Sequence, residues 1–148
     1  MRTLVTFESA AFNTTEPRDY FINPCCFGDD ACRWLMERLR QQGLPTESEP
    51  GQEDFGWYFD FTVPAGEHCC VITFRPSESG TEPGTWLAWV ERERSFVGSL
   101  LGQRSRGISP TATAAIHQAL VAPEISGVRW HLKGDFDNGQ EDRGAPEP

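Results

Sequence analysis

The sequence has few of the features by which composition identifies a protein class. No uninterrupted apolar run in its 148 residues is long enough to cross a bilayer, so no membrane-spanning helix is expected. The N-terminal residues lack the apolar core of a secretory signal, and we therefore expect a cytoplasmic protein. Lysine is nearly absent, since Lys133 stands against twelve arginines. The net charge of −9 argues against binding to nucleic acid and favours a basic protein partner.

Signature motifs of catalysis and of metal binding are also missing. There is no G-x-S-x-G nucleophile motif and no glycine-rich phosphate loop, so no cofactor is expected and the balance leans away from an enzyme. The cysteines are odd in number and show no C-x-x-C spacing, which predicts neither a disulfide framework nor a zinc ribbon. They are Cys25, Cys26, Cys32, Cys69 and Cys70.

The clearest structural signal is a β-hairpin over residues 53–74. Trp57, Phe59, Phe61 and Val63 alternate with more polar residues, which is typical of a strand with one buried face. A turn at 64–67 then leads into a second strand.

Periodicity predicts the other elements. Strands are expected at 2–9, 85–91 and 128–132, with a further short strand as one interpretation of 96–101. A helix is expected at 29–42, capped by Asp29 or Asp30 and ended by Gly43, and another from Pro110 to about residue 122.

The order β-α-β-β-β-(β)-α-β predicts an α+β two-layer sandwich. We expect a mostly antiparallel sheet of about five strands with two helices on one face. Residues 1–133 would form this single domain, and residues 134–148 an acidic disordered tail, because the tail has almost no apolar residues.

Thiol or metal chemistry is the first functional hypothesis. Its candidate ligands are Cys25, Cys26, His68 and Cys69, if the two groups meet in space. Adjacent cysteines on a strand point to opposite faces, so burial as small apolar residues is the competing interpretation.

Carboxylates and histidines give a second hypothesis. Paired acids can catalyse hydrolysis if they converge in a pocket, but capping and solvation explain most of these residues equally well. His117 is expected inside a helix and His131 on the solvent side of the last strand, where both are structural or exposed. The acids considered are Asp29, Asp30, Glu47, Glu49, Glu53, Asp54 and Asp60.

Recognition through aromatic residues is the third hypothesis. Trp86 and Trp89 fall on opposite sides of one predicted strand, so two helices on a single face leave aromatic surface uncovered. An aromatic face with an acidic rim would suit a basic partner or self-association. The candidate binding residues are Glu53, Asp54, Trp57, Trp86, Trp89 and Trp130.

The segments Asn23-Pro24-x-x-Phe27-Gly28, Trp34-Leu35, 53–57 and 128–131 resemble those of an uncharacterised family of short stand-alone bacterial proteins. The resemblance covers about residues 20–133 and implies no catalytic residues. The leading hypothesis is thus a non-enzymatic protein-binding module, such as an immunity-type protein or a homodimer. The alternative is a small enzyme or a metal or thiol protein that uses the His68-Cys69-Cys70 segment and nearby carboxylates.

Overall fold

A computed structural model describes residues 1–92 and 107–148. Its elements in chain order are β1 (Leu4–Glu8), α1 (Asp29–Gln41), β2 (Gly51–Glu53), β3 (Gly56–Val63), β4 (Gly66–Arg75), β5 (Thr85–Arg92), α3 (Pro110–Leu120), β6 (Ser126–His131), α4 (Lys133–Asp137) and the 3₁₀ turn η1 (Glu141–Arg143). The strand considered at 96–101 lies outside the described residues.

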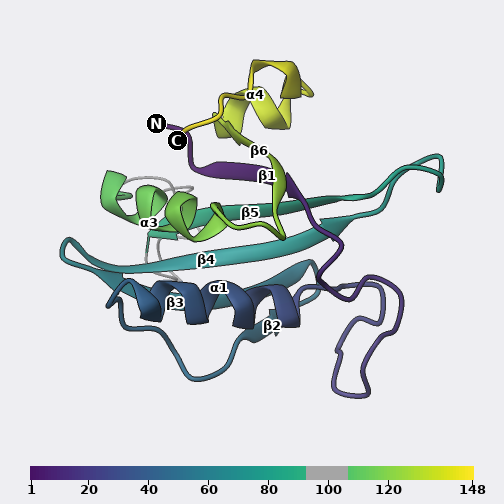
Figure 1. The fold of residues 1–148 in the computed structure, drawn as a ribbon, viewed down its shortest axis with the longest axis horizontal. Coiled ribbons are helices and arrows are strands. Elements are labelled where there is room, and N and C mark those ends of the chain that lie inside the picture. The colour runs from purple at the N-terminus through teal and green to yellow at the C-terminus, as the bar shows by residue number, and fades with distance from the viewer. Residues whose placement is uncertain (93–106) are drawn as a thin grey trace.

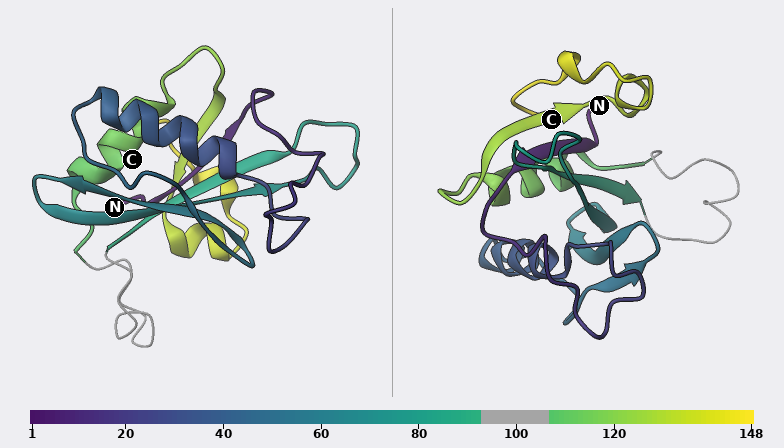
Figure 2. Two further views of the ribbon diagram at one scale, coloured as in Figure 1. Left: turned by 90° about the horizontal axis from the view of Figure 1, so that it is seen from below. Right: turned by 90° about the vertical axis from the view of Figure 1, so that its right-hand side faces the viewer.

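One antiparallel sheet organises the chain, with the strand order β2-β3-β4-β5-β1-β6 (Figure 1). Consecutive hairpins build β2 to β5, and β1 then inserts between β5 and β6. Helices α1 and α3 lie side by side on one face of this sheet (Figure 2). The predicted α+β class is therefore confirmed, with six strands where about five were expected.

The core lies between the sheet and these two helices. Alternate strand residues such as Val5, Phe59, Ile72 and Trp86 point into it because successive side chains of a strand project to opposite faces. Helix α1 contributes its apolar stripe, and α3 adds small residues that let it approach closely.

The helix ends differ slightly from expectation. Gly28 stands at the N-cap of α1 with φ of 140°, so Asp29 and Asp30 occupy the first turn rather than the cap. A glycine suits this site because its conformation is strained for other residues and its Cα packs close to Trp57. Gly43 ends the helix in the left-handed region, as predicted.

The largest difference concerns residues 134–148, for which disorder was expected. The segment instead contains α4 and η1 and returns along β6, where Trp130 and Ala145 exchange two backbone hydrogen bonds of 2.6 and 2.8 Å. Arg75 binds both carboxylate oxygens of Glu141 at 2.8 and 3.0 Å. Composition predicted too little order here because the contacts that hold the segment come from distant strands.

Candidate functional site

The sheet face opposite α1 and α3 carries the candidate site. Since Val5, Trp86 and Ala88 point into the helix-covered core, their neighbours Leu4, Leu87 and Trp89 project from the other face. Among the described elements, the short helix α4 and the 3₁₀ turn η1 lie on that side, toward β1 and β6 (Figure 2). This open face therefore leaves apolar side chains of the central strands without a full second layer.

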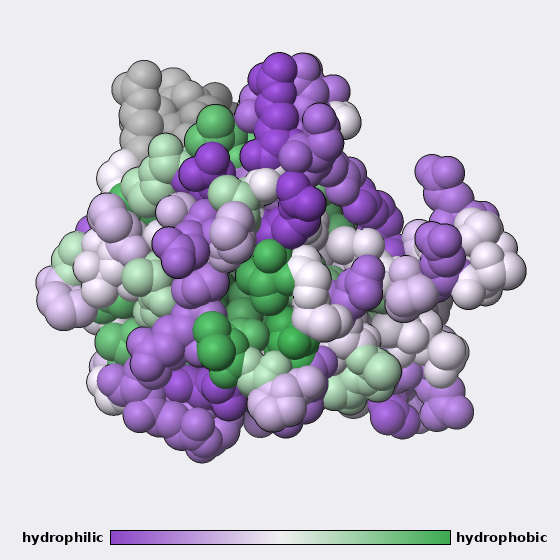
Figure 3. All heavy atoms as spheres, turned by 45° about the horizontal axis from the view of Figure 1, so that its top comes forward, coloured by the Kyte–Doolittle hydropathy of each residue, from purple (hydrophilic) through white to green (hydrophobic). Residues whose placement is uncertain are grey.

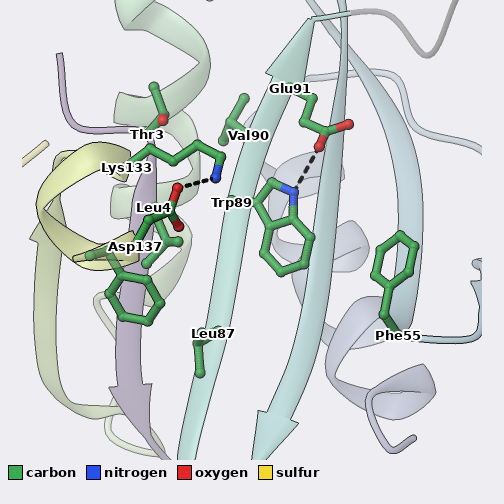
Figure 4. Close-up of a pocket in the computed structure, with 10 residues that line it drawn as sticks. Thr3, Leu4, Phe55, Leu87, Trp89, Val90, Glu91, Lys133 and Asp137 are labelled. Carbon is green, nitrogen blue, oxygen red and sulfur yellow. Dashed lines mark hydrogen bonds and ion pairs between the residues drawn. The ribbon is translucent and has the colours of Figure 1, made fainter. Parts of the chain in front are cut away.

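A cavity of about 490 Å³ lies on the open face. In a space-filling view, hydrophobic side chains gather in a hollow between polar ones (Figure 3). The residues that line the cavity come from β1 and the residue before it, from β5, from the β2–β3 turn and from α4 (Figure 4). They are Thr3, Leu4, Phe55, Leu87, Trp89, Val90, Glu91, Lys133, Phe136 and Asp137. Its volume falls within the usual range for sites that bind small molecules or a few partner side chains.

Aromatic rings form two of the cavity walls. Phe55 stacks on Trp89 with ring centroids 6.2 Å apart and planes inclined by 24°. Phe55 itself remains 50% exposed, which is unusual for a phenylalanine that has a ring partner. Phe136 of α4 lines the cavity as well, and it packs edge-on against His131 at 5.4 Å. The cavity thus offers exposed aromatic surface to a ligand.

Polar groups are fixed at the rim. The indole Nε1 of Trp89 donates a hydrogen bond of 2.9 Å to Oε1 of Glu91, which holds the carboxylate beside the ring. On α4, Lys133 Nζ lies 2.6 Å from Asp137 Oδ2. The Lys133–Asp137 pair is neutral as a whole, and Glu91 is a further ionisable group at the cavity.

An acidic row extends from the cavity across the sheet. Strand register places Glu91 beside Cys69, and Cys69 beside Asp60. Glu47 follows, because its backbone N–H donates to the carbonyl of Asp60 at 3.2 Å. Partial burial and the neighbouring Asp60 carboxyl raise the pKa of Glu47. Of the acids considered in the sequence, Glu47 and Asp60 therefore meet on this face, and Glu91, which was not among them, lies in the same row.

The structure separates the predicted tryptophans. Trp57, Trp86 and Trp130 are buried on the helix-covered side, whereas Trp89 lies on the open face. Trp57 donates its indole hydrogen to the carbonyl of Cys26 at 2.9 Å, and Trp130 donates to His117 Nδ1 at 3.1 Å. The three buried rings are part of the core, which places Trp89 alone of these four at the cavity.

Glu53 ends β2, and Asp54 and Phe55 form the β2–β3 turn. Asn23 Nδ2 donates to the backbone carbonyl of Asp54 at 2.9 Å, which fixes the turn against the preceding loop. The two acids thus accompany Phe55 at the margin of the open face. The other acids have structural contacts: Asp29 is buried beside Tyr20 and Arg33, and Glu49 lies 3.0 Å from Arg33.

The proposed thiol or metal group does not come together. Cys26 lies near Thr73 at one end of β4, while His68 lies five residues earlier on that strand, about 16 Å along an extended chain. Among residues 1–92 and 107–148, no three His, Cys, Asp or Glu side chains are placed to hold a metal ion. Burial raises the pKa of Cys26 and of Cys69, so neither is an activated thiolate.

His68 instead has a structural role. It is fully buried, its Nδ1 donates to the Gly66 carbonyl at 3.0 Å, and its Nε2 accepts from the Ser109 backbone N–H at 3.0 Å. This pattern requires a neutral ring, with Arg92 Nη1 3.1 Å away as a second donor to Nε2. Burial, with the charge of Arg92, lowers the pKa of His68. The ring thus ties β4 to the N-terminus of α3.

His131 is buried rather than exposed. It is 2% accessible, and its Nε2 lies 2.8 Å from Thr6 Oγ1. The C-terminal segment covers it, because Phe136 packs on the ring and Gly144 lies so close that a Cβ would fall 2.5 Å from its Cε1. The interpretation of this strand face as solvent-exposed was wrong for His131, since the tail was expected to be disordered.

Sequence reasoning missed several cavity residues. Leu4 and Leu87 were counted only as strand residues, and Phe136 only as part of a polar tail. The sequence contains two indications of cavity residues. Phe55 follows two acids in a segment next to a turn, and Phe136 is an isolated aromatic residue among polar ones.

Comparison of the chain with models of protein families, with curated proteins and with solved structures finds no match in any of the three. The resemblance at the 23–28, 34–35, 53–57 and 128–131 segments therefore stays a prediction. Within the described parts of the chain, no helix is long and apolar enough to cross a membrane.

Proposed function

We propose that the protein is a non-enzymatic binding module that holds a segment of a protein partner on the open face of its sheet. The observation that carries this proposal is the cavity of about 490 Å³, walled by Trp89 and the half-exposed Phe55. Aromatic residues in such a pocket are typical anchors of protein interfaces.

A catalytic role has less support from the same residues. At the cavity, the ionisable groups are Glu91, which is bonded to the Trp89 indole, and the Lys133–Asp137 ion pair. Each is held by a neighbouring side chain, and the described cavity lining contains no Ser, Cys or His. The acidic chain, at a net charge of −9, favours association with a basic protein.

Site-specific crosslinking in the producing organism tests the proposal. Phe55 is replaced by p-benzoylphenylalanine, and Glu37, which is exposed on the outer side of α1, carries the same probe as a control. We expect a defined adduct from position 55 and none from position 37. An adduct between two copies of the chain would identify a homodimer.

The captured protein is then purified and its affinity measured. Trp89→Ala should weaken binding at least about thirtyfold, because removing a central aromatic anchor costs roughly 2 kcal/mol or more. Equal affinity of Trp89→Ala and the unsubstituted protein would refute the proposal.

A further inference from the structure

The C-terminal wall (residues 133–145) closes one side of the cavity. Three residues of α4 line the cavity (Figure 4), and they are Lys133, Phe136 and Asp137. Beyond α4, the Glu141 carboxylate binds Arg75 of β4 at 2.8 and 3.0 Å. The chain then returns along β6, where Ala145 pairs with Trp130. The wall is therefore a separate piece of chain that is tied to the sheet at a few points.

The contacts that hold the C-terminal wall lie at the surface. Neither α4 nor η1 contains a buried residue, and the side chains of the Arg75–Glu141 pair are 45% and 41% exposed. Exposed ion pairs of this kind add little stability. The wall can therefore leave the sheet without opening the core between the sheet and the helices α1 and α3, as weakly held surface segments do.

The group that the C-terminal wall covers is His131. The side chain of Phe136 packs on the ring, and a Cβ at Gly144 would fall 2.8 Å from its Nδ1. Gly144 has φ of −61°, which any residue adopts, so the contact with the ring is what leaves no room for a side chain there. The burial of His131 thus depends on the wall being in place.

The covered ring has a hydrogen-bond partner for only one of its nitrogens. Nε2 lies 2.8 Å from Thr6 Oγ1, whereas Nδ1 is buried and has no hydrogen-bond partner within residues 1–92 and 107–148. A neutral ring has one N–H and needs one acceptor, but the imidazolium donates through both nitrogens. Protonation would therefore leave an N–H of a charged ring buried beneath Gly144 without an acceptor.

The charges around His131 also disfavour its protonation. Arg129, Arg75 and Arg2 repel a positive ring, and the Glu141 carboxylate that attracts it is already bound by Arg75. Burial is the largest effect, and with these arginines it lowers the pKa of His131. The remaining charges of the elements packed here are the Lys133–Asp137 and Arg143–Asp135 pairs, the exposed Asp142, and Glu8 at the other end of β1.

We propose that the C-terminal wall is pH-sensitive: protonation of His131 displaces it from the sheet, which opens the cavity on that side and weakens the hold on the partner in mild acid. The displacement stands on the contacts of His131 alone, and the effect on the partner rests on the proposed function. Once the wall has left, water supplies acceptors for both ring nitrogens. Displacement also removes the Phe136 ring from the cavity.

The sign of the pH dependence follows from the two states of the wall. With the wall in place the pKa of His131 is lowered, and with the wall displaced the ring returns toward the ordinary value of about 6.5. The stability of the wall is therefore complete above about pH 6.5 and falls as the pH drops toward the lower pKa. Between pH 7.5 and 5.5 the linkage changes the opening equilibrium by up to about tenfold.

Amide hydrogen exchange of the full-length protein, without a partner, tests the displacement. After correction for the intrinsic exchange rate, protection of residues 133–145 should fall about three- to tenfold from pH 7.5 to 5.5, beyond any change in β3 and β4. His131→Gln should remove this difference. His68→Gln, which replaces a second buried histidine at the N-terminus of α3, should retain it.

Gly144→Ala provides a variant that is open at every pH. Its Cβ would meet the His131 ring, so protection of the wall should already be lost at pH 7.5 while β3 and β4 stay protected. A wall that stays protected in Gly144→Ala, an exchange rate that is independent of pH, or a pH dependence that persists in His131→Gln would overturn the displacement and leave the proposed function intact.

The affinity for the partner captured through position 55 tests the effect on binding. We expect it to be about threefold or more weaker at pH 5.5 than at pH 7.5, and this difference should disappear in His131→Gln. Equal affinities at the two pH values would overturn the effect of the wall on binding. Absence of an adduct at position 55 would refute the proposed function and with it this effect, whereas the exchange data would still decide the displacement.

Discussion

Trp86 and Trp89 lie on the same strand, β5, but project from opposite faces of the sheet. Trp86 is fully buried and contacts the rings of Phe7, Phe12 and Phe74. Trp89 stacks on Phe55 and lines the cavity of the open face. Substituting each tryptophan in turn therefore tests the core and the candidate site separately.

Their substitution by alanine should affect stability unequally. Trp86→Ala should lower the free energy of unfolding by about 3–5 kcal/mol, because it leaves a large cavity in the core. Trp89→Ala should cost about 1–2 kcal/mol, since a half-buried ring loses less contact and water can occupy its place. Urea denaturation measures both values, and equal losses would show that Trp89 is a core residue.

Much of the fold followed from local patterns in the sequence. Alternating aromatic residues predicted β3, and the 64–67 turn predicted its hairpin with β4. The strand predicted at 85–91, with Trp86 and Trp89 on opposite sides, is β5. Strand β2 was missed because its polar sequence Gly-Gln-Glu has no strand signal; it forms by pairing with residues 56–58 of β3.

Stability should fall as the pH is lowered from 7.5 to 5.5. Burial lowers the pKa of His68 in the folded protein below its ordinary value of about 6.5, so the unfolded chain binds more protons in this range. The stability that depends on neutral His68 is thus complete above about pH 6.5 and is lost as the pH falls toward the folded pKa. Urea midpoints across this range measure the slope.

Glutamine at position 68 removes the titration. His68→Gln should be less stable at pH 7.5, because the acceptor for the Ser109 N–H is displaced, but its stability should depend less on pH. His131 also has a lowered pKa through burial, so His131→Gln serves as the matched comparison and should remove a separate part of the slope. An unchanged slope in His68→Gln would contradict the assigned neutral state.

Thiol labelling should distinguish one cysteine from the other four. Cys25 is exposed, whereas Cys26, Cys32, Cys69 and Cys70 are buried. We expect one rapidly labelled thiol in the native protein, absent in Cys25→Ser, and five in denaturant. Rapid labelling of Cys69 would contradict its burial and revive the thiol hypothesis.

The C-terminal segment should be held mainly by Phe136. Its ring packs on His131, and the Arg75 guanidinium lies over it at 5.8 Å. Phe136→Ala should therefore increase amide hydrogen exchange in residues 133–145 while leaving β3 and β4 protected. Glu141→Gln, which alters an exposed ion pair, should have a smaller effect and lower the free energy of opening this segment by about 0.2–1 kcal/mol. Equal exchange in the unsubstituted protein and Phe136→Ala would show that the backbone pairing of Ala145 with Trp130 holds the segment without Phe136.

The candidate site was harder to predict than the fold because its residues come from four separate segments. The sequence placed Trp89 on a second face, but only the strand order β4-β5-β1 brings Leu4 beside it. The contact of Phe55 with Trp89 depends on the β2–β3 turn, and Phe136 depends on the return of the chain over β6. These relationships depend on long-range pairing, which local periodicity does not report.

The most direct test of the open-face account follows the tryptophan indole N–H signals by NMR while the partner captured through position 55 is added to the full-length protein. Trp89→Phe assigns the signal of Trp89. The account predicts that this signal shifts in proportion to occupancy, while those of the buried Trp57, Trp86 and Trp130 stay in place. A bound partner that leaves the Trp89 signal unmoved, or that shifts the signal of Trp34 on α1 instead, would contradict it.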